Sequence, residues 1–248
     1  MVIRQRAIQA EDKQERHHAI LDAAARLLLR SPERIANMAD VADEAGLAKG
    51  TVYLYFPSKE ELLLAVHERN IDGFFRALVE RLNRAEPVAV TDILALTHEH
   101  MVEPPLFLPL AARCFGLMGQ SVPAEAAVAF KQRMAERLMA AGAGLERHFP
   151  ELKAGGGGVA LLRHSYALII GLWQMSAESA GNRSICPMNT PEAPLRDTSP
   201  KGAERLGAAL RRSDAGPGEM PSVFSYSYGD ELDRGLLALW NGTVGGPR

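Results

Sequence analysis

The chain has 248 residues, 47% of them hydrophobic, which suits one globular domain of ordinary size with a small second one. Its 28 Lys and Arg and 30 Asp and Glu give a net charge of −2, so overall charge does not indicate a nucleic-acid partner. No apolar run reaches membrane-spanning length, no secretory signal is seen, and Cys114 and Cys186 lack metal-ligand spacing. We therefore expect a cytoplasmic protein that needs neither a cofactor nor a metal ion.

The N-terminal segment carries three basic residues that could contact a nucleic acid. Arg4, Arg6 and Lys13 could reach phosphates or an adjacent groove, and they could equally lie on a solvated tail. Residues 1–59 contain nine Lys or Arg and eight Asp or Glu. DNA binding by this region must therefore come from the local arrangement of its side chains, because its net charge is close to zero.

Residues 37–61 have the pattern of two short helices joined by a tight turn. Asn37 can cap the first helix by accepting from its free backbone N–H groups, and Gly46 suits the left-handed residue that ends it. The second helix is expected at residues 48–55. A helix-turn-helix unit of this size can place its second helix in the major groove of DNA.

A long third helix is predicted directly after this unit. Pro57 disfavours helix at the residue before it, and Ser58 with Glu61 forms a capping box that begins a new helix. That helix should end near Arg84. Lys59 lies at its N-terminus, where free N–H groups and the helix dipole attract phosphate.

The second helix carries side chains that suit DNA. Its exposed residues combine one cation, one hydroxyl and two amphipathic aromatic rings: Lys49, Thr51, Tyr53 and Tyr55. Gly50 has no side chain, so the backbone and the groove can approach closely. The alternative is that the aromatic rings belong partly to the core and the lysines are solvated. We accept that alternative for Phe56 and favour DNA contact for both tyrosines.

Residues 41–62 closely resemble the DNA-binding domain of TetR/AcrR-type transcriptional regulators, and residues 19–28 look like the first helix of that family. The resemblance implies contacts to base edges from Lys49, Gly50 and Tyr53. It implies contacts to phosphates from Thr51, Tyr55, Lys59 and the cap residue Asn37. Two features depart from the family pattern: Ser or Thr is common at the positions of Asn37 and Ala48, and the loop at residues 31–36 lacks a frequent glycine.

Beyond residue 84 the sequence predicts only helices, separated by Pro, Gly and polar segments. We expect helices at residues 91–103, 105–119, 121–148, 159–179 and 228–240. Thr91 and Ser121 are the expected caps, Pro105 is expected in a first turn, and residues 155–158 form a flexible link. Residues 180–222 are rich in Pro and Gly and are interpreted as a mobile surface segment, or alternatively as a lid over a ligand.

The predicted fold class is all-α, with about nine helices in three parts. Residues 1–58 form a helix-turn-helix DNA-binding domain, residues 59–84 a linking helix, and residues 85–248 a larger helical domain for ligand binding and dimerisation. The helices at residues 159–179 and 228–240 are apolar enough to need a partner surface, and in the resembled family the last two helices pair with their copies in a second subunit. The alternative is that they form the core of the larger domain.

Regulators of the resembled family usually bind a small molecule among the middle helices of the larger domain. Met and aromatic side chains suit an adaptable apolar cavity. The candidate lining residues are Phe107, Leu110, Cys114, Phe115, Met118, Met134, Trp173 and Met175. Each could instead be packed core. Polar groups that could orient a ligand, or could equally be exposed, are His98, Arg113, His164 and Gln174.

No arrangement of residues favours catalysis. His98 and His100 are two positions apart and do not share a helix face, so a solvated helix surface is expected there. The sequence has no nucleophile elbow, no phosphate-binding glycine loop and no Cys pair. The predicted function is a DNA-binding, ligand-responsive repressor that acts as a homodimer on a palindromic operator, and not an enzyme. The alternatives are a dimeric adaptor or architectural DNA-binding protein without an effector, and a helical enzyme or sensor that retains the N-terminal unit.

Overall fold

The computed structural model describes residues 2–31, 37–117, 121–155, 157–176 and 227–244. Within these ranges the chain forms nine α-helices, one short π-helix and one 3-10 helix, and no strand. The predicted all-α class and helix count are confirmed. Residues 180–222, predicted as a loop or lid, and Cys186 lie outside the described residues.

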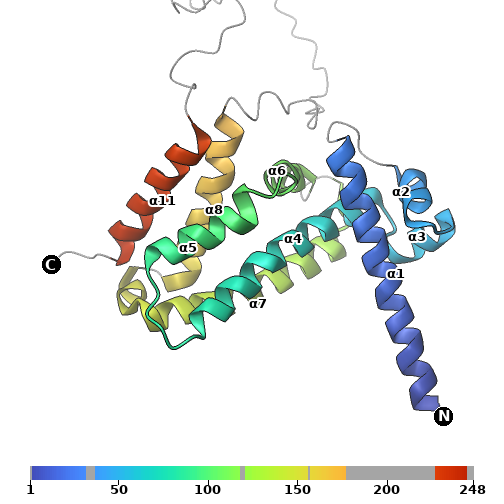
Figure 1. The fold of residues 1–248 in the computed structure, drawn as a ribbon, viewed down its shortest axis with the longest axis horizontal. Coiled ribbons are helices and arrows are strands. Elements are labelled where there is room, and N and C mark those ends of the chain that lie inside the picture. Colours follow the sequence, from blue (N-terminus) through green and yellow to red (C-terminus); the bar gives the residue numbers. More distant parts are fainter. Residues whose placement is uncertain (1, 32–36, 118–120, 156, 177–226, 245–248) are drawn as a thin grey trace, which may run out of the picture.

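Three helices form the N-terminal unit: α1 (Val2–Arg30), α2 (Met38–Ala45) and α3 (Lys49–Tyr55). The segment that carries Arg4, Arg6 and Lys13 is helical and is not an irregular tail. Its sequence contains no Pro or Gly, so nothing local interrupts the helix. The N-terminal end of α1 projects away from the rest of the chain in Figure 1.

The N-terminal unit closes around fully buried aliphatic residues. Ile20 and Ala23 of α1, Val41 of α2 and Val52 of α3 have no exposed surface. Each large aliphatic side chain stabilises the fold by about 1.5–3 kcal/mol when it is fully buried. One face of α3 is therefore held by the core, and the opposite face is left for a partner.

Helix α4 (Lys59–Leu82) joins the two parts of the molecule and ends two residues before the predicted Arg84. Its first turns pack into the N-terminal core through Leu62 and Leu63. Its later turns pack into the core of the larger domain through Phe74 and Leu78. At 1.5 Å per residue α4 spans about 36 Å, so it connects the two cores as one rigid element.

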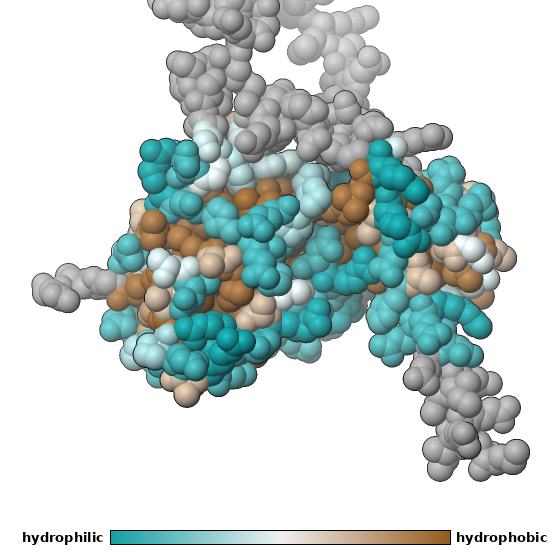
Figure 2. Space-filling model, viewed as in Figure 1, coloured by the Kyte–Doolittle hydropathy of each residue, from teal (hydrophilic) through white to brown (hydrophobic). Residues whose placement is uncertain are grey.

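The larger domain contains α5 (Val90–Thr97), the π-helix η1 (His98–Val102), α6 (Phe107–Leu117), α7 (Ala124–His148), the 3-10 helix η2 (Pro150–Gly155), α8 (Gly157–Met175) and α11 (Tyr228–Val244). α7 packs along α4 and α8, and α8 lies beside α11 (Figure 1). α8 ends earlier, and α11 ends later, than the expected residues 179 and 240. Apolar side chains reach the surface among polar ones over the area of α5, α8 and α11 (Figure 2).

Two predicted helix caps are wrong. α5 starts before Thr91, because the Asp92 carboxylate takes the capping role and accepts the Ala89 N–H at 2.8 Å. α7 has Pro123 and not Ser121 at its N-cap position. A proline lacks an N–H group and has a fixed φ, so it is well suited to the start of a helix.

Two further boundaries differ from the prediction. Pro105 lies in a turn ahead of α6 and is not in its first turn. Gly157 and Gly158, expected in a flexible link, begin α8. A Cβ atom on Gly158 would lie 2.5 Å from the carbonyl oxygen of Gly142 in α7. These glycines therefore let α7 and α8 cross with their backbones in contact.

Candidate nucleic-acid interface and ligand cavity

The turn between α2 and α3 has the predicted geometry. The Asn37 Oδ1 accepts from the backbone N–H groups of Ala39 and Asp40, both at 2.9 Å, which makes Asn37 the N-cap of α2. Gly46 ends α2 with a φ of 67°, in the left-handed region that favours glycine. The turn therefore fixes the direction in which α3 leaves it.

The outward face of α3 is centred on Gly50 and Leu54. Both lie two positions from the buried Val52, so at 3.6 residues per turn they point about 160° away from it. Leu54 is 85% exposed, about twice the exposure of Tyr53 at 43%. A Cβ atom on Gly50 would meet no neighbour within 4 Å. Leu54 was not among the predicted contacts, although its spacing from Val52 places it on the exposed face of the helix.

The remaining α3 candidates flank this face on two sides. Lys49 and Tyr53 lie on one side, with the lysine Nζ 5.9 Å from the centroid of the tyrosine ring. Thr51 and Tyr55 lie on the other side and are half-buried. The ring centroid of Tyr55 is 6.4 Å from that of His17 in α1, so part of this tyrosine packs inside the unit. Phe56, the residue after α3, is buried.

The start of α4 adds a cation next to α3. The Ser58 hydroxyl oxygen accepts from the Glu61 N–H at 3.1 Å. The Glu61 carboxylate accepts from the Ser58 hydroxyl and not from its backbone N–H, so only half of the predicted capping box forms. The Lys59 ammonium lies 3.7 Å from Glu60 and its side chain is 45% exposed. It can therefore contact a phosphate at this helix N-terminus.

Ion pairs tie α4 to the helices on either side of it. Arg69 donates to Asp22 of α1 at 2.6 Å. The adjacent Glu68 accepts from Arg133 of α7 at 2.6 and 2.7 Å and from Arg137 at 2.9 Å. Burial raises the pKa of Glu68, but the hydrogen bonds from both arginines outweigh burial and hold that pKa below its ordinary value. Glu68 therefore stays charged at neutral pH.

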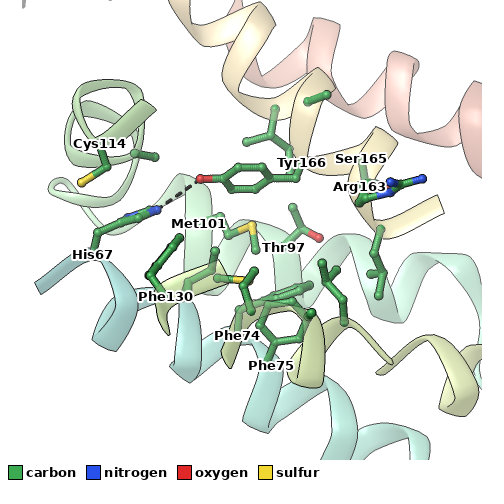
Figure 3. Close-up of a pocket in the computed structure, with 18 of the residues that line it drawn as sticks. His67, Phe74, Phe75, Thr97, Met101, Cys114, Phe130, Arg163, Ser165 and Tyr166 are labelled. Atoms are coloured by element: carbon green, nitrogen blue, oxygen red, sulfur yellow. Dashed lines mark hydrogen bonds between the residues drawn. The ribbon is translucent and has the colours of Figure 1, made fainter. Parts of the chain in front are cut away.

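A cavity of about 430 Å³ lies inside the larger domain, and its lining residues come from α4, α5, η1, α6, α7, α8 and α11 (Figure 3). Its volume is in the range of small-molecule sites. Most of the lining is apolar and comes from Leu64, Ile71, Phe74, Phe75, Ile93, Met101, Phe130, Met134 and Leu162. The described lining includes no Asp or Glu, and its two cations, Lys131 and Arg163, are exposed.

Two buried hydroxyl groups in the lining are bonded to their own helices. The Thr97 hydroxyl donates to the Ile93 carbonyl at 2.8 Å. The Ser165 hydroxyl donates to the Leu161 carbonyl at 2.9 Å and lies 3.0 Å from the Trp240 indole nitrogen, which donates to it. These groups are therefore already satisfied within the protein.

An imidazole, a phenol and a thiol occupy one end of the lining. His67 Nε2 and the Tyr166 hydroxyl form a hydrogen bond of 3.2 Å, drawn as a dashed line in Figure 3. Burial lowers the pKa of His67 to about 4 and raises the pKa of Cys114 to about 12. Both side chains are therefore neutral at neutral pH.

Two of the residues predicted to line a pocket, Cys114 and Met134, contact the cavity. Phe107 is fully buried with its ring centroid 5.5 Å from that of His67, and it packs behind the lining. Leu110 is buried in the core of the N-terminal unit. Phe107 and Leu110 belong to the packed core because α6 directs both side chains toward α4.

The other predicted pocket residues lie elsewhere. Trp173 and Met175 are in the last turns of α8, away from the cavity, and Met175 is 57% exposed. The side chains of Phe115 and Met118 lie outside the part of the chain that the structure describes. The largest contribution that sequence reasoning missed comes from α4: His67, Ile71, Phe74 and Phe75. The apolar residues in the second half of α4 were the sequence feature that could have indicated this contribution to the lining.

None of the four polar candidates is among the described lining residues: His98, Arg113, His164 and Gln174. Arg113 is buried, and His164 and Gln174 are exposed. His98 Nε2 lies 2.6 Å from the Asp233 carboxylate of α11. The expected solvated surface at residues 98–100 therefore holds for Glu99, which is exposed, whereas His98 and His100 are partly buried. No group of three potential metal ligands occurs in the described ranges.

Two family models match this chain. The model described as "Bacterial regulatory proteins, tetR family" matches residues 20–66, which include α2, α3 and the start of α4. The model described as "Tetracyclin repressor-like, C-terminal domain" matches residues 68–196, more than half of the chain. The chain belongs to the tetR family of bacterial regulatory proteins.

Three curated relatives are similar over part of their length. The uncharacterized HTH-type transcriptional regulator YfiR of Bacillus subtilis (strain 168) is 38% identical over 68 residues, 27% of this chain and 33% of the relative. The fatty acid metabolism regulator protein of the same organism is 28% identical over 86 residues, 35% of this chain and 43% of the relative. The HTH-type transcriptional activator FasR of Mycolicibacterium smegmatis is 34% identical over 70 residues, 28% of this chain and 32% of the relative. The matches therefore span about a third to two fifths of these relatives.

Membership of the tetR family makes the chain a DNA-binding transcriptional regulator and not an enzyme. The helix-turn-helix predicted at residues 37–61 lies within the N-terminal match. Among the helices that the structure describes, none is long and apolar enough to cross a membrane.

Proposed function

We propose that this tetR-family regulator is a cytoplasmic, homodimeric, ligand-responsive repressor that binds a palindromic operator. The main support for this proposal is that α4 extends from the DNA-binding unit to the cavity. Ser58 and Lys59 begin this helix beside α3, and His67, Ile71 and Phe74 of the same helix line the cavity. A ligand in the cavity would therefore contact the rigid element that positions the DNA-binding unit.

In this proposal α3 is the recognition helix. Base-edge contacts come from Lys49, Gly50 and Tyr53, and phosphate contacts come from Thr51, Tyr55, Lys59 and Asn37. The Asn37 oxygen is used to cap α2, which leaves its amide N–H groups to donate to a phosphate. We add Leu54 to the base contacts, because an exposed apolar side chain suits the methyl group of thymine in the major groove.

The dimer would form through residues 159–179 and 228–240. Partly buried apolar side chains on α8 and α11 support this choice: Leu168, Leu172, Trp173, Leu237 and Leu239. A second copy would cover them in a two-fold interface. Such a dimer presents two recognition helices to successive major grooves, about 34–36 Å apart. A palindromic operator follows from that symmetry.

The cavity supports a mainly apolar effector and disfavours the alternative of an adaptor or architectural protein, whose interior would be filled. A relative named a fatty acid metabolism regulator is consistent with an apolar ligand. The repressor-like description of the C-terminal match supports repression. One relative is named a transcriptional activator, so the proposal of repression rests on the description of the C-terminal match.

Selection from random duplexes with the purified protein tests this function. The wild-type protein should enrich one inverted repeat, and Tyr53→Ala should enrich a weaker and more degenerate sequence. Arg76→Ala is the matched control, since Arg76 is an exposed α4 residue beyond the DNA-binding unit. Failure of the wild-type protein to enrich any sequence would contradict the proposal.

A further inference from the structure

The exposed part of the cavity lining shows where the cavity opens. Four of the described lining residues are exposed: Lys131 and Ala135 on α7, and Arg163 and Ala167 on α8. The lining residues that come from α4, α5, η1, α6 and α11 are all buried. The cavity therefore opens to solvent between α7 and α8.

The two helices present the same combination of side chains at this opening. Ala135 follows Lys131 by four positions and Ala167 follows Arg163 by four, so each pair lies on one face of its helix. The short alanine side chains leave room for a ligand to enter, and a cation lies beside each of them. In Figure 3 the Arg163 guanidinium lies at the edge of the lining residues and points away from the interior.

The charges of these two cations are not neutralised by the described part of the chain. Neither Lys131 nor Arg163 has an ion-pair or hydrogen-bond partner among the described residues, and the described lining contains no Asp or Glu. In contrast, Arg133 and Arg137 of the same helix α7 are both paired with Glu68. The positive charge at the opening is therefore available to an anion.

The interior of the cavity suits a different part of a ligand. Its buried lining is mainly apolar, and the hydroxyl groups of Thr97 and Ser165 already donate to carbonyls of their own helices. A charged group inside would lose its hydration without gaining a charged partner. At the opening, a charged group stays partly hydrated and meets two cations. The distribution of charge therefore matches a molecule with an apolar chain and an anionic end.

We propose that the effector is an amphipathic anion whose apolar chain fills the cavity and whose anionic head group lies at the opening, near Lys131 and Arg163. This inference rests on the proposed function, because it takes the cavity as the effector site. The chain enters first, and the head group remains between α7 and α8. The two cations then select among ligands of equal chain length by the sign of the head-group charge.

Isothermal titration calorimetry of the full chain with octanoate, octylammonium and 1-octanol at neutral pH tests the inference. The probes share one alkyl chain, and 1-octanol reports the contribution of the chain without a charge. Octanoate should bind about tenfold or more tightly than octylammonium, because one exposed ion pair is worth up to about fivefold in affinity and the ammonium is repelled. Octyl phosphate should also bind more tightly than octylammonium, and its affinity relative to octanoate identifies the preferred anionic head group.

The double variant Lys131→Met with Arg163→Met removes both charges and keeps long apolar stems. It should abolish the preference for octanoate over octylammonium and leave the affinity for 1-octanol unchanged. The matched control is Lys153→Met with Arg76→Met, which removes the same number of charges from exposed residues outside the cavity lining. The control should keep the wild-type preference.

The inference is overturned if octylammonium binds the wild-type protein as tightly as octanoate, or if the preference for octanoate survives in the double variant. A double variant that loses 1-octanol and octanoate affinity by the same factor also overturns it, because the two side chains would then only support the cavity. If the double variant does not fold, the ranking of octanoate and octylammonium on the wild-type protein decides.

Absence of binding by every probe would overturn both this inference and the assignment of the cavity as the effector site. The selection of operator sequences is independent of that result. The DNA-binding part of the proposed function therefore fails or stands separately from the ligand class.

Discussion

At the scale of single residues, the outward face of α3 joins an exposed leucine to a lysine and a tyrosine. Leu54 is the only wholly apolar side chain of the three, and it is 85% exposed. The residues beside it, Lys49 and Tyr53, can hydrogen-bond to base edges or phosphates. An apolar group between them can add only shape and methyl contacts, which are specific to thymine.

Leu54→Ala should weaken operator binding by about tenfold, because it removes an aliphatic side chain whose full burial is worth about 1.5–3 kcal/mol. Replacing the contacted thymine by uracil removes only its methyl group and should weaken the wild-type protein by a similar factor. The two changes should not add, since both remove one contact. Fluorescence anisotropy with thymine and uracil duplexes measures this, and full additivity of the two losses at every thymine would refute the contact.

His67 gives the fold a defined dependence on pH. Its pKa is about 6.5 in the unfolded chain, and burial lowers it to about 4 in the fold. As pH falls below 6.5 the unfolded chain takes up a proton that the folded chain does not, so the free energy of unfolding decreases toward pH 4. The loss attributable to His67 is at most about 3 kcal/mol across that window.

Urea unfolding of the wild-type protein and His67→Phe between pH 7 and pH 5 measures that contribution, with the pH range set by the same linkage. The variant should lose stability less steeply than the wild type as pH falls. His164→Phe changes an exposed histidine and is the control that should follow the wild-type curve. Parallel curves for wild type and His67→Phe would show that this imidazole does not carry the effect.

The difference between prediction and structure at this scale has a physical reason. Asn37, Gly46 and the α3 residues could be predicted because caps, turns and helix faces depend on neighbours within a few positions. Leu54 was missed because an apolar residue is assigned to the core by default, and only its position opposite Val52 shows otherwise. His67 was missed because its burial depends on Phe107 and Tyr166, which are distant in sequence.

At the scale of elements, the crossing of α7 and α8 fixes the framework around the cavity. The sequence suggested a flexible link at residues 155–158, because a run of glycines is usually irregular. The structure instead uses Gly158 against Gly142 for a close helix contact. The contact of α7 with α8 joins residues that are distant in sequence, so a local sequence pattern cannot predict it.

Gly158→Ala should lower the free energy of unfolding by about 1–3 kcal/mol, the usual cost of overpacking. Its new Cβ would meet backbone atoms of Gly142 that cannot move aside easily. Gly73→Ala on α4 is the matched control, because its nearest neighbour, His100 Nδ1, is 3.8 Å away. The control should be neutral or more stable by up to about 1 kcal/mol, because alanine favours helix. Equal effects of the two substitutions in urea unfolding would contradict the crossing.

At the scale of the whole molecule, the proposal requires two copies that place their α3 helices on one face of DNA. The helices proposed to pair, α8 and α11, each carry apolar residues that are only partly buried in one chain. The sequence suggested this proposed interface because residues 159–179 are apolar over most of their length. The cavity could not be located in the same way, because its lining comes from six α-helices and η1.

Leu172→Glu should dissociate the dimer and weaken operator binding at least tenfold, because it places a charge in the apolar pairing surface. Met139→Glu is the matched control, since Met139 is an exposed apolar residue of α7, outside the proposed interface. Sedimentation velocity should give a monomer for the first variant and a dimer for the second. A Leu172→Glu protein that remains dimeric would exclude α8 from the interface.

Binding to operators with altered half-site spacing tests the central claim most directly. The two recognition helices of a rigid dimer should reach both half-sites of the selected inverted repeat on one face of the duplex. Inserting about half a helical turn, roughly five base pairs, moves one half-site to the opposite face. The affinity of a rigid dimer should then fall at least tenfold, toward that of a single half-site. Unchanged affinity after the insertion would contradict it.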